Sequence, residues 1–119
     1  MQNGFIKVAA SIPSVKVANC QYNVQQIENA IALAEGKGVE IIVFPELSIT
    51  GYTCQDLFSQ QLLQEASESA VLLLLDFTRQ LDIISIVGLP IAVGDLLLNC
   101  AVVIQKGQIL GIVPTEYLP

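Results

Sequence analysis

The sequence contains no histidine and only three cysteines. A structural zinc site needs four nitrogen or sulfur ligands at set spacings, so this composition does not indicate one. An odd number of cysteines at irregular spacing is typical of reduced thiols and not of a disulfide framework. We therefore expect neither a metal site nor a disulfide in this chain.

Basic residues are also few. Five lysines and arginines stand against eleven acidic residues, which gives a net charge of −6. The five are scattered along the chain, whereas a nucleic-acid-binding surface needs cations gathered in a patch or stripe. We expect no nucleic-acid partner.

The sequence lacks the long apolar segments that cross a membrane. The apolar stretch around Leu72 is interrupted at Asp76, and residues 83–93 are too short and are broken by glycine and proline. Residues 1–4 do not begin the basic and then apolar pattern of a signal peptide. We therefore expect no membrane partner and a cytoplasmic location.

Charged residues make up only 13% of the chain, against 53% hydrophobic residues. A chain of 119 residues forms one domain at most, and this composition leaves much apolar surface for something else to cover. The last residues follow a predicted strand without a closing helix. We interpret residues 1–119 as the N-terminal part of one domain of a larger protein, and we expect a homo-oligomer.

The first half of the chain predicts a strand, a helix and a second strand, at residues 5–10, about 23–36 and 39–44. Asn23 and Gln26 resemble a capping box that opens the helix, and Gly36 and Gly38 are typical of its end. Such a βαβ unit has parallel strands. The apolar residues of the helix recur at three- and four-residue spacing and predict its buried face: Val24, Ile27, Ile31 and Ala34.

The second half predicts a helix at residues 60–80, a strand at 83–87 and a hairpin. Gly88, Leu89 and Pro90 should interrupt the strand, and the hairpin strands at 99–105 and 109–113 should flank a turn at 106–108. The helix should face the core with one stripe: Leu63, Ala66, Ala70, Leu73, Phe77 and Leu81.

The most informative stretch is residues 41–58, which read IIVFPELSITGYTCQDLF. The first four residues are typical of a buried strand, and Pro45 ends it because proline gives the sheet no donor. In α/β sheets ligands bind at the carboxyl ends of strands, so Glu46 is a candidate general base. The alternative is a glutamate that merely begins a surface loop.

The same order of elements would also fit a doubly wound nucleotide-binding domain. That function needs a glycine-rich phosphate loop before a helix. No Gly-x-Gly-x-x-Gly follows the first strand, and Gly36-Lys37-Gly38 lies at the wrong end of its helix. We therefore disfavour a nucleotide site.

Phe44-Pro45-Glu46-Leu47, followed by Thr50-Gly51-Tyr52, resembles the first signature of the nitrilase (carbon–nitrogen hydrolase) superfamily. Residues 51–58, GYTCQDLF, are similar more narrowly to the glutaminase domains of glutamine-dependent NAD synthetases. The resemblance implies a fold that is part of a four-layer α-β-β-α sandwich, with residues 1–119 as the N-terminal part of the glutaminase domain. It also implies a Glu-Lys-Cys triad that hydrolyses an amide or nitrile through a thioester.

Only the glutamate of that triad is present at its expected place, as Glu46. The family carries its lysine in a run like Pro-Lys-x-x-Leu-Pro, and residues 114–119 read PTEYLP, so Thr115 holds the lysine's place. Threonine offers no cation to an anionic intermediate, and the adjacent Glu116 would repel one. The family's nucleophile lies well beyond this run.

The remaining candidate residues are one tyrosine and the three cysteines. Tyr52 matches the family's Gly-Tyr, which implies contact with the substrate at the mouth of the amide pocket, and a packing role is the alternative. Cys20, Cys54 and Cys100 are interpreted as structural residues and not as substitute nucleophiles.

The resemblance therefore implies glutamine hydrolysis that supplies ammonia for ATP-dependent NAD synthesis in the complete protein, with glutamine as substrate. It implies no cofactor in this chain; ATP and magnesium would belong to a separate synthetase domain. We expect the 119 residues alone to be inactive. The alternatives are another nitrilase-like amidase and a non-catalytic interaction module of the same fold.

Overall fold

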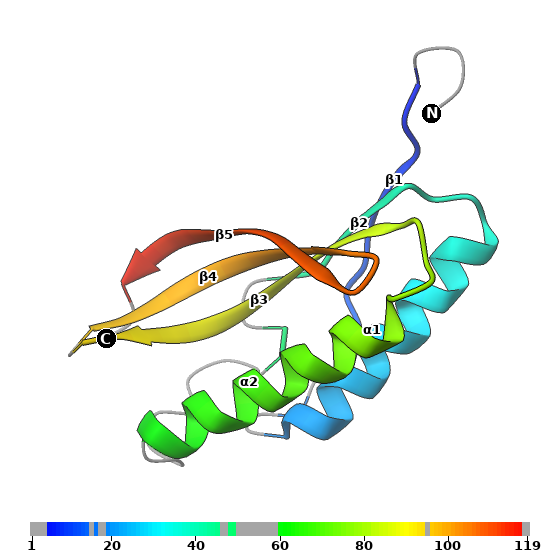
Figure 1. The fold of residues 1–119 in the computed structure, drawn as a ribbon. Coiled ribbons are helices and arrows are strands. Elements are labelled where there is room, and N and C mark those ends of the chain that lie inside the picture. Colours follow the sequence, from blue (N-terminus) through cyan, green and yellow to red (C-terminus); the bar gives the residue numbers. More distant parts are fainter. Residues whose placement is uncertain are drawn as a thin grey trace.

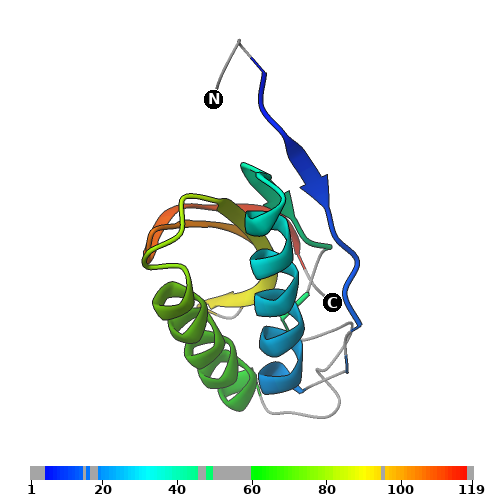
Figure 2. The same cartoon turned by 90° about the vertical axis from the view of Figure 1, so that its right-hand side faces the viewer.

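The computed structural model describes residues 5–14, 16, 19–45, 48–49, 60–94 and 96–117, with the backbone alone at residues 60–64, 96–97 and 116–117. In this part of the chain five strands form one sheet, and two helices lie together on one side of it (Figures 1 and 2). The elements follow in this order: β1 (Val8–Ala10), α1 (Cys20–Gly36), β2 (Ile41–Val43), α2 (Gln60–Phe77), β3 (Ile84–Val93), β4 (Leu96–Gln105) and β5 (Gln108–Tyr117).

The strands lie in the sheet in their order along the chain, β1-β2-β3-β4-β5. β1, β2 and β3 are parallel, and β3, β4 and β5 are antiparallel. The predicted βαβ arrangement and the predicted hairpin are both confirmed. Because the sheet grows in one direction from β1 to β3, right-handed crossovers place α1 and α2 on the same face. These three strands therefore lack the reversal in strand order at which doubly wound domains bind nucleotides.

The predicted start of the first helix is wrong. The cap is Asn19, whose side chain accepts a hydrogen bond from the backbone N–H of Tyr22 at 3.1 Å. Asn23 lies inside the first turn and is fully buried. A local pattern identified the wrong asparagine because Asn23 makes its hydrogen bonds to distant segments and not to its own helix end.

The predicted buried face is correct for α1 and only partly correct for α2, where Ala70 is buried and Phe77 and Leu81 pack against the core. All four predicted residues of α1 are buried. In α2, Leu73 is 49% exposed while its neighbour Leu74 is 1% exposed. Residues 71–75 are apolar all around the helix, so their spacing does not single out a face. The buried residues of this segment are Ser67, Ala70, Val71, Leu74 and Thr78, and Leu75, Phe77 and Leu81 are partly buried against the core.

Strand β3 continues through the predicted interruption at residues 88–90 and ends only at Val93. The pairing explains why these residues are tolerated. Strand β2 stops where Val43 pairs with Ile86, so beyond that point one side of β3 is free of strand pairing. Proline is accommodated on such an edge because its missing donor is not needed there. The other side of β3 stays paired with β4.

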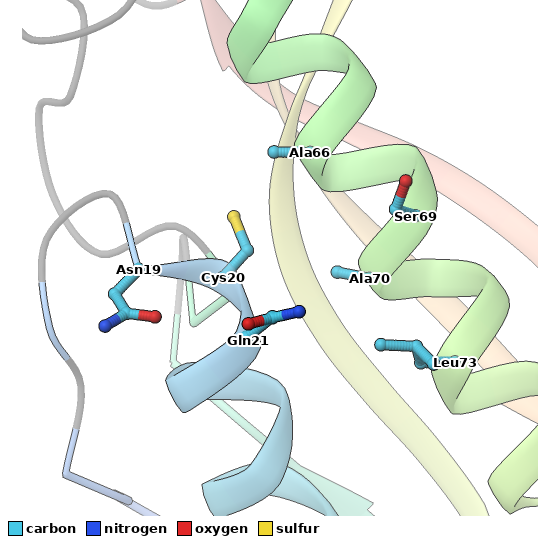
Figure 3. A pocket seen from close by; sticks show the side chains of 7 residues that line it. All are labelled: Asn19, Cys20, Gln21, Ala66, Ser69, Ala70 and Leu73. Atoms are coloured by element: carbon cyan, nitrogen blue, oxygen red, sulfur yellow. The ribbon is translucent and has the colours of Figure 1, made fainter.

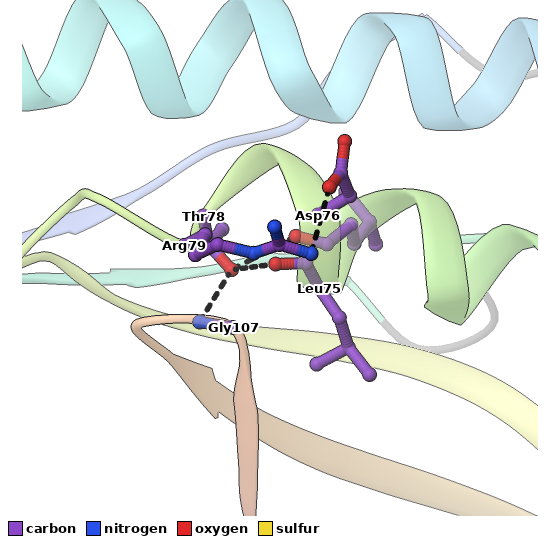
Figure 4. A network of polar contacts seen from close by, with 6 residues as sticks. Leu75, Asp76, Thr78, Arg79 and Gly107 are labelled. Carbon is purple, nitrogen blue, oxygen red and sulfur yellow. Dashed lines mark hydrogen bonds and ion pairs between the residues drawn. The ribbon is translucent and has the colours of Figure 1, made fainter.

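The turn between β4 and β5 contains two residues, Lys106 and Gly107, with φ of 51° and 75°. Positive φ at both positions is typical of the tight hairpin turns that match strand twist. The turn rests on the C-terminal end of α2, where the Gly107 N–H points to the Thr78 hydroxyl at 3.4 Å (Figure 4). The Thr78 hydroxyl also donates to the Leu74 carbonyl at 2.8 Å. This contact ties the hairpin to the helix layer.

The sheet face opposite the helices is apolar, and no described helix covers it (Figure 2). Cross-strand partners share a face, so the register identifies its members. Val8, Val43 and Val113 are 59%, 36% and 54% exposed. We call this surface the open sheet face, and its members are Val8, Ile41, Val43, Ile84, Ile86, Ala101, Val103 and Val113.

Candidate functional site

The carboxyl ends of the three parallel strands lie at one edge of the sheet, as the sequence predicts for a ligand site. Strand β2 ends at Val43, and Phe44 and Pro45 continue toward this edge. The two predicted site residues, Glu46 and Tyr52, lie outside the described residues. Their roles as general base and substrate contact therefore stay predictions, and the structure describes the segments that flank Glu46.

The segment after β2 is tied to β3 on both sides of Glu46 in the sequence. Before it, the Phe44 N–H donates to the Ile86 carbonyl at 2.9 Å. After it, the Ile49 N–H donates to the Gly88 carbonyl, and the Gly88 N–H donates to the Ser48 hydroxyl, both at 3.1 Å. Ser48 and Ile49 are 2% and 0% exposed. The chain on either side of Glu46 is thus anchored to a buried strand.

A third anchor comes from Asn23, which sequence reasoning treated only as a helix cap. Its side-chain amide donates to the Ile49 carbonyl at 2.8 Å and to the Lys16 carbonyl at 2.8 Å. Its side-chain oxygen accepts from the Lys16 N–H at 2.7 Å. The only signal in the sequence was a polar residue within the apolar stripe of α1.

Thr115, which holds the place of the family's lysine, lies in an irregularity of the hairpin. Cys100 pairs with Pro114 and Asn99 pairs with Glu116, so Thr115 is the extra residue of a β-bulge. The residue is exposed, and its hydroxyl donates to the Asn99 carbonyl at 2.8 Å in a partly buried bond. Bulges redirect side chains and are common beside active sites. Here the backbone irregularity is present, while the side chain at the bulge is neutral.

The two described cysteines lie on different elements, Cys20 at the start of α1 and Cys100 on β4. Cys100 is buried in β4, and burial raises the pKa of its thiol above the usual value. Cys20 is half-buried at the start of α1 and lines a cavity of about 350 Å³ between the two helices (Figure 3). None of the described residues that line this cavity is acidic or basic. The structural role of Cys20 and Cys100 stays a prediction, and Cys54 lies outside the described residues.

A second hollow, of about 400 Å³, lies between α2 and strands β3 to β5. Its lining is apolar apart from Glu68. The described residues contain no group of three or more histidine, cysteine, aspartate or glutamate side chains placed to hold a metal ion. In the same residues neither helix is both long enough and apolar enough to cross a membrane.

Comparison with known proteins relates this arrangement to one family. The family model described as carbon-nitrogen hydrolase matches residues 7–116. A glutamine-dependent NAD(+) synthetase from Mycobacterium tuberculosis is 34% identical over 118 residues, which cover 99% of this chain and 17% of that protein. The chain thus spans about a sixth of the length of that relative.

Solved structures agree with the sequence comparison. A glutamine-dependent NAD+ synthetase from Acinetobacter baumannii, determined in complex with adenosine diphosphate, superposes with a TM-score of 0.84 at 30% identity. The match covers 96% of this chain and 21% of that chain. An amidase from Nesterenkonia sp. superposes with a TM-score of 0.83 at 22% identity, over 100% of this chain and 46% of the amidase. The second likeness concerns the fold alone. The described helix layer and sheet match part of the nitrilase fold, as expected from the sequence.

Proposed function

We propose that this chain, which belongs to the carbon–nitrogen hydrolase family, is part of a glutaminase domain. Such a domain hydrolyses the side-chain amide of glutamine. The observation that carries this proposal is the 34% identity with a glutamine-dependent NAD(+) synthetase over 99% of the chain. The GYTCQDLF run at residues 51–58 supports the same choice. A general amidase of this fold would share the Phe44-Pro45-Glu46 segment without that run.

In this proposal Glu46 is the general base of the family's reaction. A cysteine thiol attacks the amide carbon, and its proton passes through the carboxylate to the leaving ammonia. Water then attacks the thioester as Glu46 takes a proton from it, the carbon–sulfur bond breaks to release glutamate, and Glu46 returns the proton to the departing thiolate. In the family the nucleophilic thiol lies well beyond the run at residues 114–119, so in this proposal the complete protein supplies it.

The 119 residues alone should not hydrolyse glutamine, since position 115 is a threonine and the family's nucleophile lies beyond residues 114–119. In the complete protein the ammonia would pass to a synthetase domain, where ATP and magnesium would act. We also propose a cytoplasmic location, with no nucleic-acid or membrane partner. Self-association through the open sheet face would cover surface that the described residues leave exposed.

The test is substrate preference in the complete natural protein that carries this sequence. Release of glutamate and ammonia from glutamine should exceed the release of ammonia from acetamide or butyramide at equal concentration. Faster hydrolysis of the small amides would favour the general amidase instead. A protein that hydrolyses none of them would favour the non-catalytic interaction module, which the threonine at position 115 suggests as the second candidate.

A further inference from the structure

Asn23 connects two loops that leave neighbouring parallel strands. Lys16 belongs to the segment after β1, and Ile49 belongs to the segment after β2. The Asn23 amide donates one hydrogen bond to the backbone of each, and its oxygen accepts a bond from the Lys16 N–H. Both amide N–H groups are therefore used in bonds of 2.8 Å. The side chain is 0% exposed, so water does not compete for them.

The Lys16 side of this connection is itself supported by α1. The Lys16 ammonium lies 4.4 Å from the centre of the Tyr22 ring, and the Tyr22 hydroxyl donates to the Ser14 hydroxyl at 3.0 Å. Tyr22 precedes Asn23 in the first turns of the same helix. The loop after β1 is therefore held by two adjacent residues of α1.

The Ile49 side of the connection is closed by β3. The Ile49 peptide donates to Gly88 and accepts from Asn23, while Ser48 accepts from Gly88. The backbone at residues 48 and 49 is thus fixed between a helix and a strand. Ser48 lies two residues after Glu46 in the sequence, and Phe44, bonded to Ile86, lies two residues before it.

We propose that Asn23 is a positioning residue for Glu46: together with Ser48 it holds the segment after β2 so that the carboxylate keeps a productive place. This rests on the proposed function. A general base must stay within hydrogen-bond reach of the proton that it takes, and a displacement of about 1 Å can cost about 10²-fold in rate. The Asn23 side chain makes its hydrogen bonds to backbone groups of Lys16 and Ile49, so the proposed role acts through the backbone.

Asn23→Asp tests this role with little change in shape. The carboxylate keeps an acceptor for the Lys16 N–H but loses both donors, and it faces two carbonyl oxygens that it repels. Asn29→Asp is the matched control, because Asn29 is exposed on the same helix and only accepts a bond, from the Gln25 amide at 3.1 Å. Ser48→Ala is a second variant on another element, which removes the acceptor of the Gly88 N–H.

The experiment uses the complete natural protein and measures kcat and KM for glutamine, with hydrogen exchange of peptides across the chain. Asn23→Asp and Ser48→Ala should each lower kcat about 10- to 100-fold with a smaller change in KM. Exchange should rise selectively in the peptide that contains residues 44–49. Asn29→Asp should match the wild type in both measurements.

Three outcomes would count against the proposal in different ways. An active wild type whose Asn23→Asp and Ser48→Ala variants keep kcat would overturn the positioning role. Loss of kcat in proportion to the folded fraction, with exchange raised over the whole domain, would overturn it in favour of a merely structural role. An inactive wild type would instead contradict the proposed glutaminase function, and unchanged exchange at residues 44–49 in Asn23→Asp would then separately refute the anchoring of that segment.

Discussion

The hydroxyl of Thr115 donates a hydrogen bond of 2.8 Å to the carbonyl of Asn99 across the β-bulge in the hairpin. The bond gives the threonine a structural use at the position where the resemblance places a lysine. The bulge is a property of the backbone pairing. A different side chain at position 115 would therefore lie on the same irregular stretch of strand.

Replacing Thr115 by lysine in the complete protein should raise its rate of glutamine hydrolysis. Restoring one oxyanion-stabilising donor should raise kcat about 10²–10³-fold. The hydrogen bond that Thr115 loses in this change costs about 1 kcal/mol of folding stability, which is the smaller effect. Steady-state glutamate release measures the gain. Thr115→Val is the control, since it removes the hydroxyl without adding a cation. A Thr115→Lys enzyme no faster than Thr115→Val would contradict the assignment of this position.

Gly107 should be the least replaceable glycine of the described turns. A Cβ at Gly107 would lie 3.1 Å from the Leu75 carbonyl oxygen and 3.3 Å from the Arg79 Cα, and its φ is +75°. Gly94 has a φ of +61° with nothing within 4 Å of a Cβ. Gly94→Ala should therefore cost about 1–2 kcal/mol of unfolding free energy for the left-handed backbone alone. Gly107→Ala should cost more, because the hairpin must also move away from α2.

Urea denaturation of the two glycine variants gives this comparison directly. Equal losses of unfolding free energy in Gly94→Ala and Gly107→Ala would mean that the turn at Gly107 does not pack on α2 as described.

The open sheet face should drive self-association of the 119-residue chain when it is produced alone. Apolar patches well beyond a few hundred Å² are rarely left exposed in soluble monomers. Val103→Lys places a charge in the middle of this face and should weaken association about tenfold or more, since each ~1.4 kcal/mol changes Kd tenfold. Leu33→Lys is the control, because Leu33 is an exposed apolar residue of α1 on the other side of the molecule.

Sedimentation equilibrium at micromolar concentration measures this association. A compact and folded wild-type monomer would refute the prediction.

Sequence reasoning succeeded where one local signal dominated. Ile27 and Ile31 recur at helical spacing among polar neighbours, which defined the face of α1, and Lys106-Gly107 marked the hairpin. It succeeded only in part on α2, because residues 71–75 are apolar on every side and the buried Ser67 and Thr78 do not look like core residues.

The candidate site likewise has one feature that the sequence could predict and others that it could not. Pro45 after an apolar run indicates where β2 stops, and that could be predicted. The role of Asn23 depends on bonds to Lys16 and Ile49, 7 and 26 residues away, which no pattern of a single helix contains. The continuation of β3 past Gly88 likewise depends on where a different strand ends.

The most direct test of the central claim is glutamine hydrolysis by the complete natural protein with and without the Glu46 carboxylate. Glu46→Gln keeps the size of the side chain and removes the base, so we predict glutamate release in the wild type and a loss of at least about 10² in kcat in the variant. Wild-type hydrolysis of glutamine that continues at the same rate in Glu46→Gln would contradict the account, because Glu46 would then not be the base of this family's reaction in this protein.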